Sequence, residues 1–149
     1  MDLTPGDVQV LGDLRAGLPG ADDQDATGGQ LVGFTGRRSP TAGDDIPKYL
    51  NSPTSPVFHK HQILYGLAED TDKIRRGAMP VLVEGPLDRL AVTQGSRNLA
   101  VAAVAPCGTA LTADQVAALL TLTGTRRPIA VALDPDTAGR TATLRAWQL

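Results

Sequence analysis

The chain has 149 residues, which is enough for one domain of ordinary size and excludes a large multidomain enzyme. Its hydrophobic content of 42% is typical of globular proteins, and its single cysteine excludes disulfide frameworks and cysteine-cluster zinc sites, so we expect a reducing compartment and no zinc. No apolar run approaches the roughly 18 residues of a membrane span, and no secretory leader pattern opens the chain, so we expect a soluble, cytoplasmic protein.

The first 30 residues differ from the rest in charge and texture. They carry six aspartates against one arginine, whereas the remainder is mildly basic, which is compatible with a polyanionic partner. Their Gly, Asp and Pro content and weak periodicity predict a flexible acidic leader without secondary structure. A short apolar stretch between glycines then predicts an edge strand at residues 31–35, and the four prolines in residues 39–62 predict a loop-rich segment.

From residue 79 onward the chain shows the same order three times, a short apolar run followed by a segment with helical spacing. The expected strands are residues 81–83, 100–105 and 128–133. The expected helices begin at Pro86, after a capping box formed by Thr112 and Gln115, and at Thr137. Three strand–helix units predict an α/β fold in which a parallel sheet carries helices on both faces, preceded by the loop-rich, partly β segment.

Carboxylates follow two of these expected strands. Glu84 comes directly after the first strand, with Asp88 one helical turn further on, and Asp134 and Asp136 come directly after the third. Because ligands of open parallel sheets bind beyond the carboxyl ends of the strands, we expect the four carboxylates to converge on one crevice. Such a cluster repels itself unless cations neutralise it, and all-oxygen ligation suits Mg²⁺ or Mn²⁺. The alternative is that Asp134 and Asp136 only cap the helix that follows.

Three segments of this half, VLVEGPLDRLAV, VAPCGTALTADQVAAL and VALDPDTAGRTATLRAW, resemble the Toprim domain (topoisomerase–primase fold) of bacterial-type DNA primases. The upstream stretches VGFTGRRS and PKYLNSPTSPVFHKHQILYGL resemble the segment that precedes Toprim in those primases. The resemblance covers residues 31–149. We therefore divide the chain into an acidic leader (1–30), a basic primase-core segment (31–78) and a Toprim domain (79–149) that is incomplete at its C-terminal end.

The resemblance implies roles for individual residues. The expected metal-binding carboxylates, for two Mg²⁺ or Mn²⁺ ions, are Glu84, Asp88, Asp134 and Asp136. All of them except Asp88 are also expected to be catalytic. The expected nucleotide or nucleic-acid contacts are Arg37, Lys48, Asn51, Lys60 and Arg140. Apart from the resemblance, the basic residues Arg37, Lys48 and Lys60 are interleaved with aromatic residues. This pattern combines positive charge that pairs with phosphates and rings that stack on nucleobases. The alternative is a solvated basic loop with its aromatic residues packed beneath.

The resemblance implies a DNA primase catalytic core, an RNA polymerase that makes short primers on single-stranded DNA from ribonucleoside triphosphates. The alternatives are a Toprim nuclease, which uses the same ions to activate water, and an inactive Toprim module that binds nucleic acid. The chain lacks the family's zinc-binding module, its helicase-interacting domain and a further acidic pair. We therefore expect a fragment that meets a replicative helicase only through regions outside it.

Cys107, His59 and His61 remain to be assigned. Cys107 lies in an apolar run and is expected to be a small buried residue without a redox role. His59 and His61 bracket Lys60 at a spacing that lets both face one side of a strand, but no third ligand is nearby in the sequence. We therefore expect no metal site at the histidines.

Overall fold

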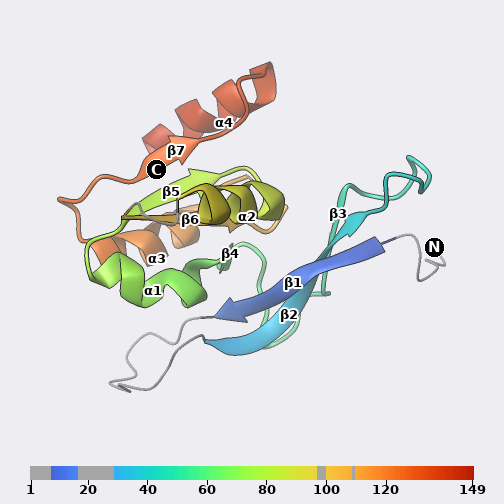
Figure 1. Ribbon diagram of the computed structural model, residues 1–149, viewed down its shortest axis with the longest axis horizontal. Helices are drawn as coiled ribbons and strands as arrows, with labels where there is room; N and C mark the ends of the chain where they lie inside the picture. Colours follow the sequence, from blue (N-terminus) through green and yellow to red (C-terminus); the bar gives the residue numbers. More distant parts are fainter. Residues whose placement is uncertain (1–7, 17–28, 97–99, 109) are drawn as a thin grey trace.

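The computed structural model describes residues 8–16, 29–96, 100–108 and 110–149. The described residues form two sheets, one of three strands and one of four strands with helices packed on it (Figure 1). The first sheet has the order β1-β2-β3 and the second the order β4-β6-β5-β7. None of the helices among the described residues is long and apolar enough to cross a membrane.

The first sheet is antiparallel and consists of β1 (Val8–Ala16), β2 (Gln30–Arg38) and β3 (Tyr49–Asn51). The prediction of a leader without secondary structure was therefore wrong for residues 8–16. The expected edge strand at residues 31–35 is also longer than predicted and lies in the middle of its sheet, because β1 covers one side and β3 the other. The rest of the expected leader, residues 1–7 and 17–28, lies outside the described residues.

Two irregularities explain why β1 is hard to recognise. Its register against β2 shifts between Val10 and Gly12 and again between Leu14 and Arg15. The first shift leaves Leu11 as an extra residue of β1, so the alternation of apolar and polar residues that marks a strand is broken within it. The second shift leaves Val32 as an extra residue of β2.

The second sheet is the expected parallel one with an antiparallel strand added at its edge. Its strands are β4 (Leu64–Tyr65), β5 (Met79–Val83), β6 (Val101–Pro106) and β7 (Ala130–Ala132). Strand β5 pairs in parallel with both β6 and β7, while β4 pairs with β6 in the antiparallel sense. All three predicted strands are present, and the last is shorter than expected.

The helices are α1 (Leu67–Arg75), α2 (Pro86–Gly95), α3 (Ala113–Thr123) and α4 (Thr137–Gln148). The predicted starts of the last three are confirmed. Pro86 occupies the first turn of α2, where its missing N–H costs nothing. Thr112 accepts a hydrogen bond from the Gln115 amide, and the Gln115 side chain accepts one from the Thr112 amide, which closes the expected capping box of α3.

Apolar side chains cover both faces of the parallel sheet. Leu82 and Val104 contact Leu119 of α3 on one face, where Leu67 of α1 also packs. Val83 points to the opposite face, because successive side chains of a strand alternate. The expectation of helices on both faces is therefore confirmed.

The opposite face joins the two sheets. There Val83 and Cys107 contact Phe58, which is 1% exposed, and Val92 of α2 and Val32 of β2 pack against the same cluster. Because Val32 comes from the first sheet, one apolar cluster links β2 to the parallel sheet. This contact fixes the first sheet beside the carboxyl ends of the parallel strands.

Candidate functional site

A hollow of about 510 Å³ opens where the first sheet meets the carboxyl ends of β5 and β7. Its acidic lining residues come from the second sheet and α2 and form what we call the acidic wall, and its basic lining residues come from the first sheet and its β2–β3 loop and form the basic wall. The acidic residues are Glu84, Asp88 and Asp134, and the basic residues are Arg37 and Lys48, with Tyr49 between the two groups. Three of the four carboxylates expected to converge on one crevice therefore line one hollow.

Each of the three carboxylates is placed by a different local structure. Glu84 directly follows β5, and Asp134 follows β7, so the parallel pairing of these strands brings both to one edge. Asp88 lies in the first turn of α2, where its Oδ2 accepts a hydrogen bond from the Gly85 amide at 3.0 Å. A carboxylate at this position is favoured by the positive end of the helix, and its second oxygen remains available to a ligand.

Asp136 is used differently from the other carboxylates. Its Oδ1 accepts a hydrogen bond from the Gly139 amide at 2.7 Å, so the side chain caps α4 and does not line the hollow. The capping interpretation therefore applies to Asp136 but not to Asp134. Arg140, in the same first turn of α4, is exposed and also does not line the hollow.

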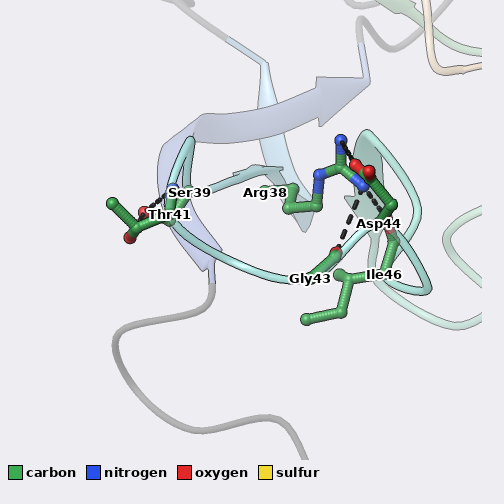
Figure 2. A network of polar contacts seen from close by, with 6 residues as sticks. All are labelled: Arg38, Ser39, Thr41, Gly43, Asp44 and Ile46. Atoms are coloured by element: carbon green, nitrogen blue, oxygen red, sulfur yellow. Dashed lines mark hydrogen bonds and ion pairs between the residues drawn. The ribbon is translucent and has the colours of Figure 1, made fainter.

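The basic wall comes from β2, β3 and the loop that joins them. Arg37 and Tyr49 are directly opposite each other across the two strands, so their side chains share a face. Arg38 points to the other face, where its guanidinium donates to the carbonyl oxygens of Gly43 at 3.2 Å and Ile46 at 3.0 Å (Figure 2). The Arg38 amide also donates to the Lys48 carbonyl at 3.1 Å. Arg38 thus ties down the loop that leads into Lys48.

The contacts of Arg38 with the loop differ in how much they stabilise it. Arg38 also forms an ion pair with Asp44 at 3.0 Å, but the Asp44 side chain is fully exposed, and such pairs contribute little. The hydrogen bonds to two backbone carbonyls therefore carry most of the anchoring. At the start of the loop, the hydroxyl groups of Ser39 and Thr41 are hydrogen-bonded to each other (Figure 2). Sequence reasoning did not identify Arg38, because its role depends on how the loop closes.

Charged residues on both walls of the hollow influence the pKa of Tyr49. Burial raises the pKa of its phenol, the Arg37 guanidinium opposes that increase, and Asp88, Glu84 and Asp134 add to it. The phenol is therefore protonated at neutral pH and can donate a hydrogen bond.

A second hollow of about 530 Å³ adjoins the first and shares Lys48 and Tyr49 with it. It is lined by Lys60 and by polar side chains of the β3 region, among them Ser52 and Asn51. The Asn51 amide nitrogen donates to the Cys107 carbonyl at 2.8 Å, which joins β3 to the end of β6. Of the five expected nucleotide contacts, four thus line the two hollows, and Arg140 does not.

Comparisons with known proteins identify the families that this chain resembles. Residues 24–71 match the family described as the N-terminal domain of the DNA primase catalytic core, and residues 81–149 match the Toprim-like family. The DNA primase of Pseudomonas aeruginosa is 44% identical over 121 residues, which are 80% of this chain and 17% of that protein. The chain belongs to the bacterial-type DNA primase family.

Solved primase structures share the fold. The zinc-binding and RNA polymerase domains of Aquifex aeolicus primase match with a TM-score of 0.67 and 41% identity, over 79% of this chain and 27% of that one. A DnaG primase catalytic domain bound to single-stranded DNA matches with a TM-score of 0.56 and 40% identity, over 79% of this chain and 34% of that one. The chain therefore spans about a fifth of the curated primases it matches and about a third of the solved domains.

The aromatic residues of this primase-family chain do not all serve the hollow. Tyr49 lies beside Arg37 and Lys48, but Phe58 is buried in the core and cannot stack on a base. Phe34 is 49% exposed, and it alternates with Arg37 along β2, which puts it on the opposite face of the strand. The interpretation of interleaved stacking rings therefore applies to Tyr49 and is wrong for Phe58.

Cys107 is buried, as expected, and the two histidines lie close to each other. Cys107 is 1% exposed, and burial raises the pKa of its thiol to about 11, which fits an inert core residue. The rings of His59 and His61 lie 5.8 Å apart. In the described part of the chain no three acidic, imidazole or thiol side chains come close enough to hold one metal ion.

The donor chemistry nevertheless fits a magnesium ion shared with a substrate. Mg²⁺ is commonly bound by one or two carboxylates together with phosphate oxygens of a substrate, and not by a closed cage of protein ligands. Glu84, Asp88 and Asp134 are exposed oxygen donors around one hollow, whose lining, as far as the structure describes it, contains no histidine or cysteine. These three residues would hold such an ion.

Proposed function

We propose that this chain forms part of the catalytic core of a DNA primase, which joins ribonucleotides into a short RNA primer on a single-stranded DNA template. The observation that carries the proposal is the division of one hollow into an acidic wall and a basic wall. A nucleoside triphosphate needs both, because its phosphates pair with arginine and lysine while a divalent ion links them to carboxylates.

The side chains of this chain supply position and charge. Arg37 and Lys48 pair with phosphate oxygens, and a guanidinium can do so with two parallel hydrogen bonds. Glu84, Asp88 and Asp134 face those cations across the hollow. Mg²⁺ or Mn²⁺, when bound to these carboxylates, would neutralise the charge that develops on the phosphate oxygens during attack by the primer's 3′-hydroxyl.

The second hollow supports a path for the template or primer strand. It adjoins the first and is lined by Lys48, Lys60 and hydroxyl-bearing side chains. Such groups contact the sugar–phosphate backbone of a strand without reading its sequence. The similar catalytic domain bound to single-stranded DNA supports strand binding by this fold.

A second candidate is an inactive module that binds nucleic acid through the basic wall alone. It is favoured by one observation, that no three metal-ligating side chains are already gathered among the described residues. In this case the acidic wall would have no role in chemistry, and the binding of strands would not depend on a divalent ion.

Primer synthesis on a single-stranded template tests the proposal directly. We expect the 149-residue chain to incorporate labelled ribonucleotides with Mn²⁺, and Glu84→Gln to abolish incorporation. Calorimetry with Mn²⁺ should show binding to the wild type and weaker binding to Asp134→Ala, while Asp136→Ala, whose side chain faces α4, serves as the matched control for metal binding. Template binding without incorporation, and without any effect of Asp134→Ala on Mn²⁺, would favour the inactive module, and template cleavage would favour a nuclease.

A further inference from the structure

Tyr49 occupies the position where the acidic and basic walls of the hollow meet. It opens β3, is half-buried, and lines both hollows. Its side chain is held from two sides, because its cross-strand partner on β2 is Arg37 and its chain neighbour is Lys48.

Both cations of the basic wall lie against the Tyr49 ring. The Arg37 Cζ atom is 5.9 Å from the ring centroid, and the Lys48 Nζ atom is 5.7 Å from it. A ring attracts cations to its electron-rich face within about 6 Å. Two like charges repel each other, so a shared ring offsets part of that repulsion and keeps the pair together.

The hydroxyl of the same residue reaches the acidic wall. A Cβ atom built on Gly85 would lie 3.0 Å from Tyr49 Oη and 3.6 Å from Asp88 Oδ2. Gly85 has an extended backbone with φ of −149°, which any residue adopts. The close approach of Tyr49, and not the backbone conformation, is therefore what favours glycine at this position.

We propose that Tyr49 is a positioning residue that holds Arg37 and Lys48 as a pair, at a fixed separation from the carboxylates, to receive the triphosphate chain of a nucleotide. The inference rests on the proposed function for the identity of its ligand. It assigns the ring to the cation pair and the hydroxyl to the contact with the start of α2. Loss of the ring should therefore weaken anion binding more than loss of the hydroxyl does.

Sodium tripolyphosphate is a suitable probe, because it carries the phosphate chain without a base or sugar. Calorimetry on the full chain without metal should show an affinity about tenfold weaker for Tyr49→Leu and an affinity within about twofold of wild type for Tyr49→Phe. Phe34→Ala is the matched control, since Phe34 lies on β2 on the face opposite Arg37, is 49% exposed and lines neither of the two hollows. It should bind as the wild type does.

A spectroscopic measurement separates positioning from a general loss of structure. The ring current of Tyr49 should shift the ε-methylene resonances of Lys48, and the chain has only Lys60 and Lys73 besides, so three signals suffice. The shift should persist in Tyr49→Phe and vanish in Tyr49→Leu, while the amide spectrum remains dispersed.

Equal tripolyphosphate affinities of Tyr49→Leu and wild type would overturn the inference. An equal loss in Tyr49→Phe and Tyr49→Leu, or no tripolyphosphate binding by the wild type, would overturn it too. If the ring-dependent binding is found but the wild type makes no primers, the inference stands and the proposed function fails.

Discussion

Gly139 offers a sharp test of how α4 is joined to the acidic wall. It is buried in the first turn of α4, and a Cβ atom there would overlap the carbonyl oxygen of Asp134 and lie 2.9 Å from its carbonyl carbon. Ordinary contact begins at 3.4 Å, so in Gly139→Ala the carbonyl carbon of Asp134 must retreat by about 0.5 Å and its oxygen by more than that. Backbone cannot rotate out of the way as a side chain does.

The expected cost follows from two opposing effects. Overpacking of this kind costs about 1–3 kcal/mol, whereas replacing glycine by alanine inside a helix gains up to about 1 kcal/mol. Because the overlap is with backbone, the cost lies at the upper end of that range, and we expect Gly139→Ala to lower the free energy of unfolding by about 2–3 kcal/mol. Because the displaced backbone carries Asp134, the affinity for Mn²⁺ should fall as well.

Urea unfolding of matched glycine-to-alanine variants measures this effect. Gly95 is the control, since it ends α2, has no left-handed conformation, and has no atom of the described residues within 4 Å of a Cβ built on it. Gly95→Ala should be as stable as the wild type or up to about 1 kcal/mol more stable, with Mn²⁺ binding unchanged. The reasoning is refuted if Gly139→Ala and Gly95→Ala change stability in the same direction.

Two further predictions concern buried polar groups. Gln115 is fully buried and donates hydrogen bonds to the carbonyl oxygens of Lys60 and Ile63. Gln115→Leu should therefore lower the free energy of unfolding by about 2–4 kcal/mol in urea titrations, and an unchanged midpoint would contradict the assignment. Cys107, with its pKa raised to about 11 from an ordinary 9.0, should carry about 100-fold less thiolate at pH 8 than in the unfolded chain. Its alkylation, followed by mass spectrometry, should be slowed at least that much in the folded protein and should speed up about tenfold per pH unit until pH 11; equal rates with and without guanidinium would count against burial.

Much of the parallel sheet could be predicted because its signals are local. Apolar runs of three to six residues mark β5 and β6, and Pro86 and the Thr112–Gln115 capping box mark the helices that follow. Helix α1 lacks a side-chain cap and a proline at its start, and it begins after Gly66, which is in the left-handed conformation with φ of 89°. Its local signal is of another kind, acidic residues in the first turn and basic residues in the last, which complement the helix dipole. Sequence reasoning did not use that signal, so α1 was missed.

Some residues of the candidate site could also be predicted from local patterns, and others could not. Glu84 and Asp134 could be predicted because residues that directly follow parallel strands meet at one edge of the sheet. The capping role of Asp136 could be proposed but not decided, since the same Asp-x-Asp pattern serves both purposes. The role of Tyr49 depends on the pairing of β2 with β3 across a long loop, and that register is not readable from local patterns.

The two walls of the hollow come from different sheets, so the site depends on the apolar cluster that joins them. The two phenylalanines of the chain test this dependence. Phe58 is 1% exposed at the centre of that cluster, whereas Phe34 is 49% exposed on β2. Phe58→Ala removes a buried aromatic side chain and should cost about 3–5 kcal/mol, while Phe34→Ala should cost less than about 1 kcal/mol.

The two substitutions should also differ in their effect on tripolyphosphate binding. With Phe58 truncated, the cluster against which Val32 of β2 packs loses a fully buried ring, and the basic wall is held less firmly against the acidic one. Tripolyphosphate affinity, measured at a temperature where Phe58→Ala is still folded by circular dichroism, should fall for Phe58→Ala and remain unchanged for Phe34→Ala. Similar unfolding free energies for the two variants, or a larger binding defect in Phe34→Ala, would mean that the walls are held together by something other than this cluster.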